Sequence, residues 1–279
     1  MDSTNAMEEP MTYPIVFFDV DGTLLNSDKK VTPLTRFTLE LLKEQGIKLC
    51  IATGRPIKSA RLAMKLHGID HLISGYVCNN GTDTLNLISN VHNQNHLLTR
   101  DDAMKILNHV KSLNLNAMIY GQEQLYAFKM DDTVDRISEQ NHLEAVITDL
   151  YQLDFDTTPK VLFIVNEETS AQIHDFMAKN PLEGYQSFIS QSDLYEFVLD
   201  KAGKGKGVLA LASDFGYESK EIMAYGDAEN DHEMIQLVGH GVAMSNGDET
   251  IKSIANEVCS SNDEDGVAYS LIHHYHLSV

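Results

Sequence analysis

Two aspartates near the start of the chain are the residues best placed to do chemistry. Asp19 directly follows the apolar run at 15–18, Asp21 comes two residues later, and Gly22 follows it. Such a short apolar run is typical of a buried strand in a parallel sheet that ends at its carboxyl edge. Because side chains alternate along a strand, both carboxylates are expected on the same side. They could bind a divalent cation or pair a nucleophile with an acid/base, although an Asp-Gly surface turn fits the same pattern.

Polar residues also lie at the ends of two other predicted strands and at the start of a predicted helix. They are Thr53 and Gly54 after a strand at 47–52, Lys204 before a helix at about 207–215, and Asp227, Asn230 and Asp231 after a strand at 221–225. Ligands of open parallel sheets bind outside the carboxyl ends of the strands, so these residues are expected in one crevice. The carboxylates suit Mg²⁺, while lysine, hydroxyl and backbone N–H groups suit phosphate oxygens. A metal-held phosphoryl group beside a carboxylate is arranged for in-line attack.

The order of the predicted elements favours an α/β fold, with a doubly wound, Rossmann-like parallel sheet and an inserted α+β cap. Strands and helices alternate through the first part of the chain, as in right-handed parallel crossovers. After about residue 83 the alternation of strands and helices gives way to pairs of strands, and it returns after about residue 200. We therefore expect a discontinuous core at 12–82 and 192–279, a cap at 83–191 and a disordered leader at 1–11.

Composition excludes several classes of partner. The net charge is −20, from 41 acidic and 21 basic residues, which disfavours nucleic acid and anionic membranes. No apolar run reaches the length of a membrane span, and the polar start of the chain lacks the apolar region of a secretory signal. Three scattered cysteines without CxxC spacing indicate a reducing compartment, so a cytoplasmic protein is expected. A monomer and a weak homodimer are both left open.

Taken in order, four motifs resemble those of the haloacid dehalogenase (HAD) superfamily. They are Asp19-Val20-Asp21-Gly22-Thr23-Leu24, Thr53-Gly54-Arg55-Pro56, Lys204-Gly205 and Gly226-Asp227-Ala228-Glu229-Asn230-Asp231. The closing stretches at 241–246 and 261–268, and the position of the insert, are similar to the Cof-type (subclass IIB) sugar-phosphatase family. The resemblance covers nearly the whole chain past Tyr13, and within the insert it depends on placement more than on sequence.

The resemblance implies an Mg²⁺-dependent hydrolase that cleaves small phosphorylated metabolites, such as sugar phosphates, through an aspartyl-phosphate. Asp19 would be the nucleophile, and Asp21 would protonate the leaving oxygen and then activate water. The metal would bind the carboxylates of Asp19 and Asp227 and the backbone carbonyl of Asp21. Asp231 would support the metal-bound waters or orient the catalytic Lys204.

The phosphoryl oxygens would be held by residues from all four motifs. These are Val20, Thr53, Gly54, Lys204 and Asn230. Asn80, after the third predicted strand, either contacts the substrate or is an ordinary turn residue. The third motif is unusually rich in lysine, and its alignment favours Lys204 over Lys201 and Lys206, which are expected in a solvated loop.

Two other functions are compatible with the pattern. A phosphomutase or phosphotransferase would use the same intermediate and differ in its product. A non-catalytic sensor of phosphorylated metabolites would be expected to lack Asp19 or Asp21, since binding alone does not need them. The C-terminal His273, His274 and His276 are expected to form a frayed polar end.

Overall fold

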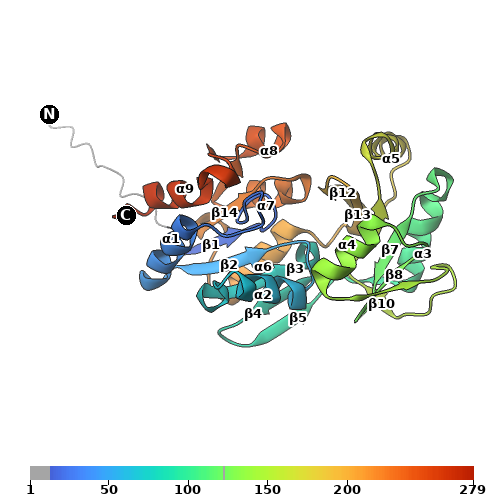
Figure 1. Ribbon diagram of the computed structural model, residues 1–279, viewed down its shortest axis with the longest axis horizontal. Helices are drawn as coiled ribbons and strands as arrows, with labels where there is room; N and C mark the ends of the chain where they lie inside the picture. The colour runs from blue at the N-terminus through green and yellow to red at the C-terminus, as the bar shows by residue number, and fades with distance from the viewer. Residues whose placement is uncertain (1–12, 122) are drawn as a thin grey trace.

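The computed structural model describes residues 13–121 and 123–279. The expected leader at 1–11, and residue 12 of the expected core, lie outside the described residues. Figure 1 shows a large sheet with its helices at one end of the molecule and a smaller sheet with its own helices at the other. Among the described residues, no helix is long and apolar enough to cross a membrane.

The larger sheet has eight strands and is mostly parallel. In spatial order they are β16 (Glu257–Cys259), β15 (His240–Met244), β14 (Ile222–Gly226), β1 (Ile15–Phe18), β2 (Lys48–Ala52), β3 (Ile73–Cys78), β4 (Asp83–Asn86) and β5 (Val91–Gln94). The first six strands run parallel, and β4 and β5 add an antiparallel hairpin at one edge. This confirms the predicted doubly wound core.

Both faces of this sheet are buried, which explains the continuous apolar character of β1. Val16 and Phe18 pack into the hydrophobic core on one face, and Ile15 and Phe17 pack into the core on the other. One face is covered by α1 (Pro33–Glu44), α2 (Ile57–Leu66) and α9 (Gly266–His274), and the other by α6 (Lys204–Asp214), α7 (His232–Leu237) and α8 (Glu249–Ile254). By alternation, Asp19 follows Ile15 and Phe17 toward the face that α6 covers.

The smaller sheet has six strands and carries the remaining helices. Its order is β12 (Tyr185–Gln191), β13 (Leu194–Leu199), β11 (Val161–Ile164), β7 (Ala117–Tyr120), β8 (Gln124–Ala127) and β9 (Glu144–Ile147). The helices are α3 (Arg100–His109), α4 (Asp132–Asn141) and α5 (Glu167–Lys179), and a two-stranded ribbon joins β6 (Leu98–Thr99) to β10 (Thr157–Thr158). A mixed sheet with helices confirms the expected α+β insert, which we call the cap.

Two segments pair with a different sheet from the one expected for them. The hairpin β4–β5, expected in the cap, extends the larger sheet, and β13, expected in the core, belongs to the smaller one. The hairpin covers the β3 edge, whose backbone groups would otherwise lack partners. Strand pairing of this kind is a long-range choice that local sequence does not reveal. We therefore propose that the cap spans 95–200 and the core spans 13–94 and 201–279.

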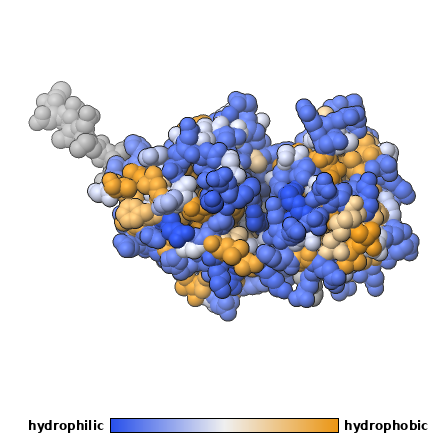
Figure 2. Space-filling view, viewed as in Figure 1, coloured by the Kyte–Doolittle hydropathy of each residue, from blue (hydrophilic) through white to orange (hydrophobic). Residues whose placement is uncertain are grey.

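The expectation of a frayed histidine end is wrong for His274. This residue is the last of α9, and its Nε2 lies 2.5 Å from the Glu257 carboxylate. His273 and His276 are exposed. On the face shown in Figure 2, the surface is mostly hydrophilic with separate apolar patches, as the acidic composition predicts.

Candidate active site

The predicted catalytic residues lie at the carboxyl ends of three neighbouring strands. Asp19 follows β1, Thr53 follows β2 and Asp227 follows β14, in the spatial order β14-β1-β2. The backbone N–H of Asp19 donates to the Tyr225 carbonyl at 3.0 Å, so the parallel ladder continues to this point. The order of the strands in the sheet therefore brings motifs more than 200 positions apart to one edge.

Three carboxylates and one lysine form the centre of this site. Each of Asp19, Asp227 and Asp231 offers an oxygen, and these oxygens lie within 4.8 Å of one another. Lys204, the first residue of α6, is buried and donates from Nζ to Asp19 Oδ1 at 2.7 Å and to Asp231 Oδ1. Asp231 Oδ2 accepts the backbone N–H groups of Asp227 at 3.1 Å and Ala228 at 3.2 Å. Asp231 therefore holds both the Lys204 ammonium and the backbone of the loop that begins at Asp227.

The electrostatics of this cluster favour a bound cation. Burial raises the pKa of Asp19 well above its ordinary value, Lys204 opposes this rise, and Asp231 and Asp227 add to it. Burial and the charge of Asp231 raise the pKa of Asp227 to about 7. Burial disfavours the charge of Lys204, but Asp19 and Asp231 more than offset this effect and raise its pKa. Three carboxylates facing one lysine leave an excess of negative charge, and the oxygen-only donor set matches the preference of Mg²⁺.

A glycine permits the first loop to approach the Asp227 carboxylate. Gly22 has a φ of +92°, and a Cβ there would lie 2.3 Å from Asp227 Oδ2. The next residue, Thr23, donates from its hydroxyl to Asp227 Oδ1 at 2.7 Å. The Gly-Thr pair of the first motif thus orients the carboxylate supplied by the fourth motif.

Asp21 lies in the same cavity as Asp19 but outside the three-carboxylate cluster. Arg55 donates to both of its oxygens, from Nε at 2.9 Å and from Nη2 at 2.8 Å. Lys29 adds a longer contact of 3.4 Å to Asp21 Oδ1. The side chain of Asp21 is a quarter exposed and lines the cavity.

Three of the six predicted phosphate-binding residues, Thr53, Gly54 and Asn230, line the cavity with Asp19. Lys204 contacts Asp19 directly, and Val20 is buried in the core next to Asp19 in the sequence, its carbonyl accepting the Leu25 N–H at 2.9 Å. Asn80 is fully buried and is not among the lining residues.

Asn80 links the core to the cap instead. Its Nδ2 donates to Glu196 at 2.7 Å, and its Oδ1 accepts from Asn230 at 3.1 Å. Its φ of 54° lies in the left-handed region that asparagine tolerates, which fits the turn interpretation.

Only one lysine of the third motif reaches the centre. Lys201 is exposed, and Lys206 donates to the Ala202 carbonyl at 3.3 Å and pairs with Glu233 at 3.1 Å. Lys204 alone of the three contacts Asp19, in agreement with the alignment of the motif.

Sequence analysis missed the cap residues that close the cavity. Lys160 and Glu196 are both buried and lie 2.9 Å apart, and Lys160 Nζ also donates to the Gly54 carbonyl at 2.9 Å. A glutamate inside the otherwise apolar strand β13 was the available signal, since a buried charge requires partners. The pair thus links the cap to the Thr53-Gly54 loop of the core.

The cavity enclosed by core and cap is small. Its volume is about 40 Å³, and five of its lining residues also line a wider crevice of about 1020 Å³ between core and cap. Sites for small organic ligands usually measure some 300–1,000 Å³. The small cavity therefore suits an ion or waters, and a metabolite has room only in the wider crevice, which Asp21 also lines, or in a cavity enlarged by movement of the cap.

Comparison with known proteins places this arrangement among hydrolases. Residues 16–271 match the family model of haloacid dehalogenase-like hydrolases. The chain is 30% identical over 271 residues to Bacillus subtilis YxeH, covering 93% of this chain and 97% of the relative. It is 27% identical over 267 residues to the 5-amino-6-(5-phospho-D-ribitylamino)uracil phosphatase YitU of the same organism, covering 94% and 98%. The solved structure of a HAD subclass IIB sugar phosphatase superposes with a TM-score of 0.79 at 21% identity, covering 94% and 98%, and shows the same fold.

Proposed function

Because this chain belongs to the haloacid dehalogenase-like hydrolases, in their Cof-type branch, and is a phosphatase, we propose that it hydrolyses small phosphomonoesters through an aspartyl-phosphate at Asp19. One observation carries the proposal: buried Lys204 joins Asp19 to Asp231 beside Asp227, at the ends of adjacent parallel strands. A buried group of like charges is costly unless a ligand neutralises it.

Asp19 is the nucleophile in this proposal. Its Oδ1 is held by Lys204, which leaves Oδ2 to attack phosphorus and form the acyl phosphate. The Lys204 ammonium then faces the phosphoryl oxygens, whose negative charge it stabilises during transfer. Thr53, the Gly54 backbone, Asn230 and the Val20 backbone supply the surrounding donors.

Asp21 is the acid/base. It lies two residues after the nucleophile in the same cavity, where it can protonate the leaving oxygen and later activate the hydrolytic water. Arg55 keeps its carboxylate oriented through two hydrogen bonds. The positions of Asp19 and Asp21 therefore separate the covalent role from the proton-transfer role.

The residues present fit Mg²⁺ as cofactor. Asp19 and Asp227 would hold it with the backbone carbonyl of Asp21, and Asp231 would fix Lys204 and the Asp227 loop behind it. When bound, the ion neutralises phosphoryl charge and orients the phosphate against Asp19. Burial is the main cause of the raised pKa of Asp227, and the charge of Asp231 adds to it, so a bound cation would favour the charged form of this carboxylate.

The cap selects the leaving group. Tyr120, Gln140, Asn141 and Gln191 of the cap line the cavity opposite the carboxylates. Amide and hydroxyl groups of this kind hydrogen-bond to the hydroxyls of a sugar or polyol. The related YitU acts on a phosphorylated ribityl compound, which belongs to that class. We propose sugar or polyol phosphates as substrates and a cap that opens to admit them.

We infer the compartment and the partners of the protein from its cysteines and its net charge. The three cysteines are free and buried, which fits a reducing cytoplasm. The acidic surface disfavours nucleic acid and anionic membranes as partners. We propose a monomer or weak homodimer whose partner is the small phosphorylated metabolite.

Phosphate release tests the proposal directly. Wild type and Asp19→Asn would be compared on a panel of sugar, polyol and nucleotide phosphates, with Mg²⁺ and with a chelator. We expect Mg²⁺-dependent turnover that falls by roughly 10⁴-fold or more in the variant, as when other nucleophiles are removed. Lack of turnover in folded wild type would contradict hydrolysis, and an isomerised sugar phosphate without net phosphate release would indicate a mutase.

A further inference from the structure

Outside the active site, two histidines and a glutamate converge at the opposite edge of the larger sheet. His240 is the first residue of β15, Glu257 is the first of β16 and His274 is the last of α9. These are the amino ends of parallel strands, whereas the active site lies at their carboxyl ends. At about 3.3 Å per residue, a five-residue strand separates the two sites by roughly 15 Å.

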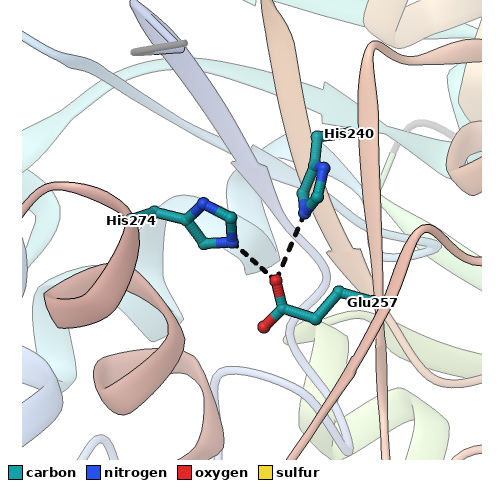
Figure 3. Close-up of side chains that lie close together, drawn as sticks. All are labelled: His240, Glu257 and His274. Atoms are coloured by element: carbon teal, nitrogen blue, oxygen red, sulfur yellow. Dashed lines mark hydrogen bonds and ion pairs between the residues drawn. The ribbon is translucent and has the colours of Figure 1, made fainter. Parts of the chain in front are cut away.

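The side chains meet at one carboxylate oxygen. Glu257 Oε2 lies 3.2 Å from His240 Nε2 and 2.5 Å from His274 Nε2, and Figure 3 shows the two imidazoles approaching it from different directions. Each residue offers one donor atom, and the three donor atoms lie within 4.8 Å of one another. We propose that His240, Glu257 and His274 form a second metal site, which binds zinc or a similar first-row transition-metal dication.

The sheet register explains why these three residues share one face. Val242 of β15 pairs with Glu257 in the sheet and lies two residues after His240. The side chains of His240 and Glu257 therefore point to the same side of the sheet. Val242 packs in the same hydrophobic core as Leu271 of α9. The last turn of α9 therefore brings His274 onto the face that already holds His240 and Glu257.

Neighbouring groups hold the strand starts and the carboxylate in place. The Asn256 N–H donates to the Gly241 carbonyl at 2.9 Å, and the Gly241 N–H donates to Asn256 Oδ1 at 2.8 Å. Ser270 donates to Glu257 Oε1 at 2.8 Å and itself accepts from the Tyr225 hydroxyl at 3.0 Å. These hydrogen bonds occupy Glu257 Oε1 and leave Oε2 facing both histidines. Groups behind a metal ligand commonly orient it in this way.

The donor set is typical of zinc rather than magnesium. Two imidazoles and one carboxylate are a recurring zinc set that leaves a fourth position for water, whereas Mg²⁺ prefers oxygen ligands. Bonds of about 2.0–2.1 Å in tetrahedral geometry place ligand atoms about 3.3 Å apart. The 3.2 Å between His240 Nε2 and Glu257 Oε2 is close to this value, whereas His274 Nε2, now 2.5 Å from Glu257 Oε2, would move away from it when the ion binds. The three side chains are 18–28% exposed, so an ion and its water can reach them from solvent.

A bound ion here would fasten the end of the chain to the sheet. It would connect β15, β16 and α9 and so restrain the last helix against the edge strands. The alternative is that Glu257 simply accepts hydrogen bonds from both histidines. Metal binding distinguishes the two, because a hydrogen-bonded trio has no specific affinity for zinc.

The experiment measures metal binding with no substrate present. Full-length protein, freed of metal by dialysis, would be titrated with Zn²⁺ by calorimetry in excess Mg²⁺, and separately with Co²⁺ while its visible absorption is recorded. Asp227→Asn removes a carboxylate of the active-site cluster and should not change the result. Wild type is expected to bind one Zn²⁺ per chain, and Co²⁺ is expected to give the intense absorption of a four-coordinate site with nitrogen ligands.

Variants locate the site. His240→Gln and His274→Gln should each weaken Zn²⁺ binding by about 100-fold or more, since loss of even an outer partner can cost about 10–100-fold. His273→Gln changes the adjacent exposed histidine and should leave the affinity unchanged. Equal affinity in all these proteins, or no zinc bound at micromolar concentration, would overturn the proposal. If both histidine variants fail to fold, the Co²⁺ spectrum of wild type decides, because only weak six-coordinate absorption would then contradict it.

Discussion

Arg55 binds both carboxylate oxygens of Asp21 and so ties the loop after β2 to the loop after β1. The two hydrogen bonds, 2.9 and 2.8 Å long, form a side-by-side pair between guanidinium and carboxylate. The arginine is part of the second motif, but its contact with the first motif exists only in the folded chain. Because a planar guanidinium fits a carboxylate in this way and an ammonium does not, Arg55 determines the direction of Asp21 as well as its surrounding charge.

Replacing Arg55 with lysine should therefore impair catalysis while keeping the charge. We expect Arg55→Lys to lower kcat by on the order of 10²-fold, the scale associated with misplacing a catalytic group by about 1 Å. KM should change less, because in the proposed mechanism Asp21 acts on the leaving oxygen rather than holding the phosphate. Steady-state kinetics would show the split, with Lys58→Arg as a control at an exposed position nearby. A proportional rise in KM with unchanged kcat would assign Arg55 to substrate binding instead.

The protein without metal should lose stability as the pH rises through neutrality. The pKa of Asp227 is raised to about 7 in the folded state, whereas an unfolded aspartate titrates near about 3.9. Between these values the folded state binds more protons than the unfolded state, so stability falls with rising pH. From about pH 5.5 to about pH 8 the loss from this one group is about 2 kcal/mol.

Mg²⁺ should reverse this loss, because it replaces the proton on the same carboxylate. Urea unfolding at the two pH values, with Mg²⁺ and with chelator, would measure the effect as a larger stabilisation by Mg²⁺ at the higher pH. Asp227→Asn is the control, since it cannot titrate and should remove this group's share of the pH dependence, leaving the share that comes from the raised pKa of Asp19. Equal stabilisation at both pH values in wild type would contradict the assignment.

The buried pair of Lys160 and Glu196 should be far more sensitive to losing one partner than to losing both. Lys160→Met leaves Glu196 buried without its cation, which should cost about 3–5 kcal/mol of unfolding free energy. Adding Glu196→Gln should recover a large part of that loss. Urea unfolding of the two single variants and the double variant gives the coupling energy. Lys129→Met, at an exposed cap position, should be close to neutral, and a similar loss there would point to a general effect of charge.

Gly22 and Gly46 form a matched pair that separates backbone strain from contact with the active site. Both have positive φ, +92° and +84°, but a Cβ at Gly22 would clash with the Asp227 carboxylate, whereas at Gly46 it meets nothing within 4 Å. Each alanine variant should lose about 1–2 kcal/mol from the left-handed conformation. Only Gly22→Ala should also lower kcat strongly, because Asp227 must move. Phosphate release and urea unfolding measure the two effects, and equal kinetics in both variants would contradict this account.

Much of the fold and of the central site was predictable because the relevant signals are local. The apolar run before Asp19 indicates a strand buried on both faces, and alternation along it places Asp19 and Asp21 at the same edge. Parallel crossovers then require the other motifs to join them there. The position of Lys204 followed from alignment of its motif and matches the geometry at α6.

Other features were not predictable because they depend on which distant surfaces meet. Strand β4, expected in the cap, pairs with β3 in the core sheet, and β13, expected in the core, pairs with β12 in the cap sheet. Asn80, expected to face either the substrate or a turn, is buried between Glu196 and Asn230.

By itself, the sequence determined the types, order and spacing of the proposed catalytic residues, and with them the parallel core, because side-chain chemistry and strand periodicity are properties of short segments. Only the tertiary structure decided that Arg55 holds Asp21, that Lys160 and Glu196 close the cavity, and that His274 joins His240 and Glu257. Each of these contacts joins side chains on different elements. Their distances are set by how strands pair and helices pack across the whole chain, which no short segment encodes.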